Sequence, residues 1–366
     1  KPGVVRMRVD GICRECLHIP ANKMNAVVAR IKILSRLDIA EKRKPQDGKI
    51  SVKMQGKPLE LRVATLPTVN GEGAVLRVLA AGDPLPFAKL NMSPRNEESA
   101  ERLLKIPHGI ILVVGPTGSG KTTTLHAWLG HINTPERKIC TAEDPVEITQ
   151  PGLQQVQIHS KIGLTFAVAL RAFLRCDPDV ILIGEMRDNE TAHAGIEASL
   201  TGHLVFSTLH TNSAPETVVR LLDMGLDPMN FADALIGVLA QRLVRTLCGE
   251  CKVQDQPTPE EWERLQHYYG EEHFPELGLT YETAKIWRPG GCARCNETGY
   301  RGRTGIHELM EATIPMKKII GKNSTVDEIK TQAVADGMRT LMQDGVFKIL
   351  KGDTDLEQLL RVAASH

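Results

Sequence analysis

The segment 115–122, with the sequence GPTGSGKT, carries the residues of this chain best suited to binding a phosphate. It follows the apolar run 110–114 and leads into the helix-forming run 123–129, so a buried strand should enter a glycine-rich turn and a helix should leave it. Such a turn directs several backbone N–H groups, together with the positive end of the helix, at one anion. The alternative is an ordinary glycine-rich connection. The residues predicted to bind a nucleotide here are Gly115, Pro116, Thr117, Gly118, Ser119, Gly120, Lys121, Thr122 and Thr123.

Within this segment two side chains have distinct chemical tasks. Lys121 can reach the β- and γ-phosphates of a nucleoside triphosphate, and the hydroxyl of Thr122 can ligate Mg²⁺. Hydrolysis further needs a carboxylate on a neighbouring strand. The apolar run 180–184 ends in Glu185, which is placed to orient or activate a water in line with the γ-phosphate. Glu143 and Asp144 end another strand and could hold Mg²⁺ through water. Acids at strand ends are also common as caps, which is the alternative for all three.

Two histidines bracket a third apolar strand. His203 precedes the run 204–209 and His210 follows it, and residues seven apart point to opposite faces of a regular strand. One of them could therefore sense the γ-phosphate while the other satisfies the core. Spacing does not decide between the two, and we take His210 as the candidate nucleotide contact.

Four cysteines have the spacing of a metal site. Cys248 and Cys251 form one C-x-x-C pair, Cys292 and Cys295 form a second, and 40 residues separate the pairs. Two such pairs complete a closed, tetrahedral four-cysteine zinc site. The alternative is two unrelated pairs of free thiols. A third C-x-x-C at 13–16 lies in a strand-like segment, where residues three apart face opposite sides, so spare or buried thiols are favoured there.

The bulk composition limits the class of protein. The chain has 366 residues, 42% of them hydrophobic, and a net charge of +1, which gives no electrostatic argument for nucleic acid or anionic lipid as the main partner. Its longest wholly aliphatic run, 110–114, is far too short to span a bilayer. We expect a cytoplasmic protein with no transmembrane segment. The first residue is Lys1, within a strand-like pattern, so we also expect that an N-terminal region is missing.

The elements that must position these residues fall into four parts. Residues 1–88 alternate like strands at 49–55, 59–65 and 75–79 and carry an amphipathic helix at 22–37. Residues 89–247 alternate apolar strands with helices, which predicts a parallel sheet covered on both faces. Residues 248–296 form the cysteine module, and 297–366 are expected to be helical, with Ser324 capping one helix. The fold class is therefore α/β.

Several motifs together resemble one family, the secretion-superfamily ATPases that drive type II secretion and type IV pilus assembly. They are the segment 115–122, AEDPVE at 142–147, DPDVILIGEMRD at 177–188, SLTGH at 199–203, LHT at 209–211, PQDG at 45–48 and QRLVR at 241–245. The resemblance covers essentially the whole chain. It implies a PAS-like N-terminal domain, a RecA-like P-loop ATPase domain, ATP, Mg²⁺ and Zn²⁺ as cofactors, and a cytoplasmic homo-hexamer that acts on an inner-membrane platform protein.

The resemblance also implies arginines that meet the nucleotide from several parts of the chain. These are Arg62, Arg77, Arg171, Arg175 and Arg303. Arg62 and Arg77 are assigned to catalysis with Lys121 and Glu185, and the other three to nucleotide binding. Retraction motors of the superfamily generally lack the four-cysteine module, whereas assembly and secretion motors carry it.

Two rival functions remain at this stage. RecA-like rings also translocate nucleic acid, although the near-neutral charge of this chain disfavours that function. A non-catalytic scaffold could instead use the nucleotide as a switch. The sequence does not distinguish pilus assembly from type II secretion.

Overall fold

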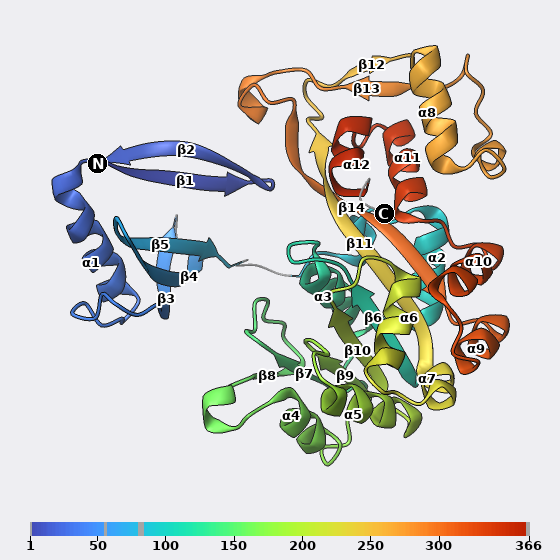
Figure 1. Ribbon diagram of the computed structural model, residues 1–366, viewed down its shortest axis with the longest axis horizontal. Helices are drawn as coiled ribbons and strands as arrows, with labels where there is room; N and C mark the ends of the chain where they lie inside the picture. Colours follow the sequence, from blue (N-terminus) through green and yellow to red (C-terminus); the bar gives the residue numbers. More distant parts are fainter. Residues whose placement is uncertain (1, 55–56, 80–83, 364–366) are drawn as a thin grey trace. The chain divides into compact units, whose positions relative to one another are not determined.

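A computed structural model describes residues 2–54, 57–79 and 84–363 of the chain (Figure 1). The chain divides into two compact units, Lys1–Asp83 and Pro84–His366. The division lies close to the boundary predicted at residue 88. Each unit has its own elements and is described by itself.

Unit 1 contains an antiparallel hairpin, one main helix and a three-stranded sheet. Its elements are β1 (Gly3–Val9), β2 (Ile12–Ile19), η1 (Ala21–Lys23), α1 (Met24–Leu34), β3 (Gln46–Met54), β4 (Lys57–Thr68) and β5 (Gly71–Val78). Strands β3, β4 and β5 lie in that order and are antiparallel. Val28, Ile50 and Val63 are buried in this unit. The strands predicted at 49–55, 59–65 and 75–79 and the helix predicted at 22–37 are thereby confirmed.

Unit 2 is built on a seven-stranded sheet with the order β14-β11-β6-β10-β9-β7-β8. Every neighbouring pair is parallel except β11 and β14, which are antiparallel. The strands are β6 (Gly109–Val114), β7 (Ile139–Glu143), β8 (Leu153–Gln157), β9 (Val180–Ile183), β10 (Leu204–Leu209), β11 (Leu235–Leu247) and β14 (Tyr300–Glu311). Strands β6, β9 and β10 are buried throughout, as expected for a parallel sheet covered on both faces.

Helices cover both faces of this sheet, and β6 shows the division clearly. Ile110, Leu112 and Val114 pack into one apolar core, whereas Ile111 and Val113 pack into the other. The first core includes side chains of α4 (Phe166–Phe173), α5 (Asn189–Leu200), α6 (Ala214–Asp223), α7 (Pro228–Ala234), α9 (Ile314–Gly321) and α10 (Val326–Ala335). The second includes side chains of η2 (Phe87–Leu90), α2 (Pro94–Leu103) and α3 (Lys121–Ile132). The predicted α/β class is confirmed.

The cysteine module extends from the end of β11. It contains β12 (Val253–Asp255), α8 (Pro259–Tyr269), η4 (Phe274–Leu277), β13 (Ile286–Arg288) and η5 (Ala293–Cys295). Trp262 packs edge-on against Phe274, with ring centroids 5.0 Å apart. These rings share a third apolar core with Val346 and Ile349 of α11 (Leu341–Lys351) and Leu359 of α12 (Leu356–Ala363). The module is therefore joined to the C-terminal helices by a common core.

Two expectations for the C-terminal part were wrong. The segment 297–366 is not helical throughout, because it begins with β14, which adds to the central sheet by pairing with β11. The cap of α10 is Thr325 instead of Ser324. The side chain of Thr325 accepts from the N–H of Glu328, and Glu328 reaches back to the N–H of Thr325, so the capping box starts one residue later than predicted. Within the described residues, no helix is both long and apolar enough to cross a membrane.

Candidate nucleotide and metal sites

Four polar segments follow four adjacent strands of the sheet in unit 2. Gly115 follows β6, His210 follows β10, Glu185 lies two residues after β9, and Asp144 follows β7. Because these strands are parallel, their carboxyl ends meet at one edge of the sheet, where α/β proteins bind ligands. The topology thus brings the predicted phosphate loop and the predicted acids to the same edge.

The phosphate loop leaves β6 and enters α3 in a backbone conformation that requires glycine. Gly115, Gly118 and Gly120 have φ angles of 150°, 81° and 89°. A Cβ atom on Gly115 would lie 2.5 Å from the carbonyl oxygen of Gln241, so a side chain has no room there. The hydroxyl of Ser119 is buried and has no hydrogen-bond partner among the described residues. An unpaired buried donor in a tight glycine cradle fits a site that takes an anion.

Lys121 points back over this loop. Its Nζ donates to the carbonyl oxygens of Gly115, at 2.8 Å, and Pro116, at 3.2 Å. Burial lowers the pKa of Lys121, and the negative charge of Glu185 acts in the opposite direction. The ammonium group is therefore held at the mouth of the loop by neutral carbonyls, which a phosphate can replace.

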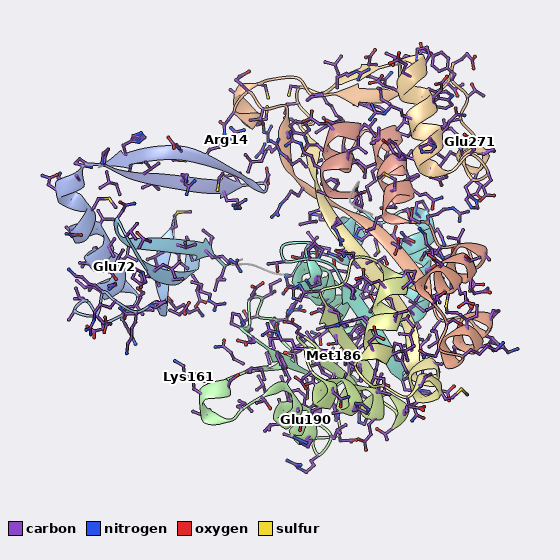
Figure 2. All side chains as sticks on the ribbon, viewed as in Figure 1. Arg14, Glu72, Lys161, Met186, Glu190 and Glu271 are labelled. Atoms are coloured by element: carbon purple, nitrogen blue, oxygen red, sulfur yellow. The ribbon has the colours of Figure 1, made fainter. Side chains whose placement is uncertain are left out.

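Glu185 is the acid whose negative charge acts on Lys121. Its Oε1 lies 3.2 Å from Nε2 of His210, and its Oε2 lies 2.7 Å from Nη2 of Arg187. The position of the segment is fixed by β10, because the N–H of Met186 donates to Thr208 at 3.0 Å and the hydroxyl of Thr208 donates to Gly184 at 2.7 Å. Met186 lies inside unit 2 (Figure 2) and is 3% exposed.

The charge state of Glu185 follows from these contacts. Burial acts to raise its pKa, but the hydrogen bond from Arg187, the charges of Arg187 and His210 and that of Lys121 together hold the pKa below its usual value. Glu185 is thus an ionised carboxylate that faces cations, which suits it to orient a water molecule. His203, in contrast, bonds through Nδ1 to the carbonyl oxygen of Ala198 at 2.9 Å, a local helix-end contact.

Glu143 and Asp144 have different surroundings although they are neighbours. Glu143 is 4% exposed, and its carboxylate contacts Nε2 of His126 at 2.9 Å, Oγ1 of Thr141 at 2.6 Å and Nε2 of Gln155 at 3.1 Å. Asp144 is exposed. Of the two acids, Asp144 is exposed to solvent, while the carboxylate of Glu143 ties the middle of α3, through His126, to the end of β7.

The five arginines lie in separate places. Arg62 on β4 stands directly opposite Arg77 on β5, and both are exposed. In unit 2, Arg171 forms an ion pair with Glu190 at 2.6 Å, and Glu190 lies at the periphery of the unit (Figure 2). Arg175 follows α4 and Arg303 lies on β14, both exposed. The ion-pair partner of Arg171 is thus on α5 and outside the phosphate loop.

Sequence reasoning gave no role to three residues that the structure places around the loop. The side-chain amide of Gln241 donates to the carbonyl oxygen of Ser119 at 2.6 Å. Arg242 donates to the backbone oxygen of Asn212 at 3.2 Å and to its side chain at 3.1 Å, two residues after His210. Arg187 holds Glu185, as described above. Gln241 and Arg242 belong to the QRLVR motif and Arg187 to the DPDVILIGEMRD motif. Their place in these motifs is the sequence feature that could have identified them.

The four cysteines of the module converge on one point. Their sulfur atoms all lie within 4.8 Å of one another, and three of the Sγ–Sγ distances are 3.9, 3.8 and 3.7 Å. A tetrahedron with metal–sulfur bonds of about 2.3 Å has edges of about 3.8 Å. The N–H of Gly299 also donates to Cys295 Sγ at 3.2 Å. The group therefore fits a tetrahedral thiolate metal site. Cys13 and Cys16 lie on β2 and are exposed.

Comparison with known proteins agrees with this arrangement. Residues 2–361 match the family described as "Type II/IV secretion system protein". The chain is 47% identical to type II secretion system protein E of Aeromonas hydrophila over 361 residues, covering 98% of this chain and 70% of that protein. It is 45% identical to the type IV pilus assembly ATPase TfpB of Acinetobacter baylyi, covering 98% of this chain and 60% of that protein.

Solved structures give the same result. The pilus retraction motor PilT with bound ADP is 26% identical with a TM-score of 0.65, and the match covers 98% of this chain and 90% of that one. The ATPase DotB of Legionella pneumophila has a TM-score of 0.69 at 20% identity, covering 99% of this chain and 91% of that one, which shows a shared fold. From the glycine cradle, the acids at the sheet edge and these matches, the chain belongs to the type II/IV secretion system protein family.

Proposed function

We propose that this protein is a Mg²⁺-dependent ATPase that powers the assembly of a type IV pilus or of a type II secretion pseudopilus. The observation that carries the proposal is the meeting of Lys121, Glu185 and His210 at the carboxyl ends of neighbouring parallel strands. Relatives over nearly the whole chain are named as ATPases of these two systems.

The residues divide the work of hydrolysis. Amides of the loop 115–122 and the ammonium of Lys121 bind the phosphates, and the hydroxyl of Thr122 is the ligand for Mg²⁺, with Asp144 available to bind its water. Glu185 orients the attacking water, and Arg187 and His210 hold its carboxylate in place. When bound there, Mg²⁺ would supply neutralisation of the negative charge on the phosphates.

Arg62 and Arg77 provide the second part of the proposal. In the register of unit 1, Arg62 of β4 stands directly opposite Arg77 of β5. Lys49 of β3 stands on the other side of Arg62 and forms an ion pair with Glu60. Like charges directly opposite one another destabilise a sheet. Two arginines directly opposite one another suit a site that receives an anion, and we assign that anion as the γ-phosphate of ATP. The contacts of these arginines would differ between the ATP-bound and ADP-bound states. Hydrolysis would therefore move unit 1 and unit 2 relative to one another.

The remaining assignments follow from family membership and the cysteine cluster. We propose that the metal of the module is Zn²⁺, that the protein works as a homo-hexamer in the cytoplasm, and that it reaches the inner membrane through a platform protein. Arg171, Arg175 and Arg303 are proposed to face the nucleotide in that assembly. The module also favours an assembly or secretion motor over a retraction motor.

Turnover of Mg-ATP by the purified oligomer tests the proposal. Wild-type protein should release phosphate, and Lys121→Ala should bind ATP weakly and release none. An oligomer that binds ATP tightly without turnover would support a nucleotide-switched scaffold. Stimulation by DNA that is lost at high salt would support a nucleic-acid motor.

A further inference from the structure

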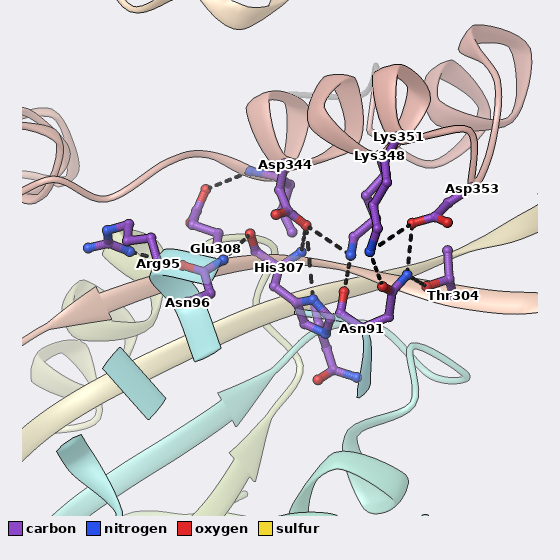
Figure 3. A network of polar contacts seen from close by, with 12 residues as sticks. Asn91, Arg95, Asn96, Thr304, His307, Glu308, Asp344, Lys348, Lys351 and Asp353 are labelled. Carbon is purple, nitrogen blue, oxygen red and sulfur yellow. Dashed lines mark hydrogen bonds and ion pairs between the residues drawn. The ribbon is translucent and has the colours of Figure 1, made fainter. Parts of the chain in front are cut away.

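One buried carboxylate of unit 2 is not used by the chemistry above. Glu308 on β14 is 5% exposed. Its Oε1 accepts from the N–H of Ala214 at 2.8 Å, and its Oε2 accepts from the N–H of Leu341 at 3.3 Å. Figure 3 shows Glu308 within the polar network below the C-terminal helices. Both oxygens are thus taken by backbone donors from elements far apart in the sequence.

The two donors have the same structural position. Ala214 is the first residue of α6, after the cap Ser213, and Leu341 is the first residue of α11, after the cap Thr340. The first N–H groups of a helix have no partner within the helix, and the helix dipole favours a negative charge there. One carboxylate therefore serves the N-termini of two helices at once.

The beginning of α6 leads directly from the catalytic region. His210, which contacts Glu185, lies four residues before Ala214. The connecting loop is held by Arg242 through Asn212 and by the side chain of Glu216, which accepts from the N–H of Asn212 at 2.8 Å. The loop that carries His210 therefore ends at Ala214, where α6 begins.

A cavity of about 650 Å³ borders the beginnings of both helices. Its lining includes the cap Ser213 and Glu216 at the start of α6, the cap Thr340 and Leu341 at the start of α11, and Glu308. Glu308 is thus a polar link between the two helix starts at the wall of this cavity.

We propose that Glu308 is a positioning residue for ATP hydrolysis, which ties the loop bearing His210 to helix α11 so that the C-terminal helices control the contact between His210 and Glu185. This inference rests on the proposed ATPase function. It identifies a route by which a partner that moves the C-terminal helices would change the rate of hydrolysis.

The first test is Glu308→Gln in the full-length oligomer. Glutamine has the same shape but offers one acceptor oxygen, so one helix N–H faces an amide NH₂ group. We expect kcat for ATP to fall about ten-fold or more, since one of the two hydrogen bonds that hold the helix N-termini is lost, while KM stays within about two-fold. Ala214→Pro removes one of the two donors without changing Glu308, at a helix position that suits proline. Because Ala214 is fully buried in the core, thermal unfolding of this variant is measured alongside its kinetics. Ala214→Pro should lower kcat in the same way and serves if Glu308→Gln fails to fold.

Asp344→Asn is the matched control. Asp344 is a similarly buried carboxylate on α11. It accepts at 2.8 Å from the N–H of His307, the residue that precedes Glu308 in sequence (Figure 3). It should lower thermal stability but leave kcat within about two-fold. Equal losses of kcat in Asp344→Asn and Glu308→Gln would overturn the inference, because both would then report stability alone.

A double-mutant cycle with His210→Ala completes the test. If Glu308 acts through His210, the double variant is no slower than His210→Ala alone, whereas independent, multiplicative losses would refute the link. The outcomes separate the two proposals: an inactive wild type removes the proposed function, but an active wild type with an equally active Glu308→Gln removes this inference only.

Discussion

His210 contacts Glu185 through Nε2 and Oε1 at 3.2 Å, although the two residues follow different strands of the sheet. The contact arises because β9 and β10 are adjacent and parallel, so their carboxyl ends lie side by side. His210 therefore belongs to the group that positions the carboxylate, whereas His203, at the other end of β10, belongs to the helix end at Ala198. The two histidines at the ends of one strand thus have different contacts: His210 with an acidic side chain and His203 with a helix end.

Replacing Glu185 by Gln should leave ATP binding intact and lower kcat by about 10²–10⁴-fold, the usual contribution of a positioned acid or base. The amide keeps the size of the side chain but cannot accept a proton. Phosphate release and binding of a fluorescent ATP analogue measure the two effects separately. Glu197→Gln, an exposed acid on α5, is the control. Normal turnover in Glu185→Gln would remove its assigned role.

The pH profile should respond to Arg187. The bond from Arg187 is the largest influence that lowers the pKa of Glu185, against the raising effect of burial. In the wild type, Glu185 therefore stays ionised below the usual value of 4.5, and activity is lost only as pH falls through this lowered pKa. In Arg187→Ala the acid limb of kcat against pH should move to higher pH. An unmoved acid limb would show that another group controls it.

The sequence predicted the chemistry at the sheet edge better than the parts around it. Strand-then-acid patterns were sufficient for Glu185 and Asp144, because parallel strands place their carboxyl ends together. β14 was missed because its sequence, YRGRTGIHELME, carries charges and glycines, and its strand form depends on pairing with β11. The buried bonds of Glu143 to His126 and of Glu308 to Ala214 join residues 17 and 94 positions apart, which no local pattern reveals.

Glu143 should contribute to stability in a pH-dependent way. Burial acts to raise its pKa, but bonds from His126, Thr141 and Gln155 leave it below its usual value of 4.5. A lowered pKa means that its stabilisation is fully present above about pH 4.5 and is lost as pH falls through the lowered value. Glu143→Gln should cost about 1–3 kcal/mol at neutral pH and weaken the acid sensitivity of unfolding. Denaturant unfolding at several pH values measures this, with Glu147→Gln as the control. An unchanged acid sensitivity would contradict the assignment.

Removing the metal should loosen the cysteine module. The purified protein should contain one zinc per chain, and Cys248→Ser should lose it, because three thiolates no longer complete the tetrahedron. Hydrogen exchange should then rise across residues 248–296, while Cys13→Ser, at an exposed cysteine of β2, should keep the metal and the protection. Metal analysis that finds no zinc in the native protein would disprove the assignment.

The opposed arginines of unit 1 give a test that separates function from folding. Because Arg62 and Arg77 are exposed cations facing each other across β4 and β5, replacing either by Ala relieves repulsion and should leave thermal stability unchanged or slightly higher. Turnover should nevertheless fall by at least about 10³-fold if these guanidinium groups stabilise charge on the γ-phosphate. Lys53→Ala, at an exposed cation of β3, should change neither property. Full activity in Arg62→Ala and Arg77→Ala would mean that the two opposed arginines have a partner other than ATP.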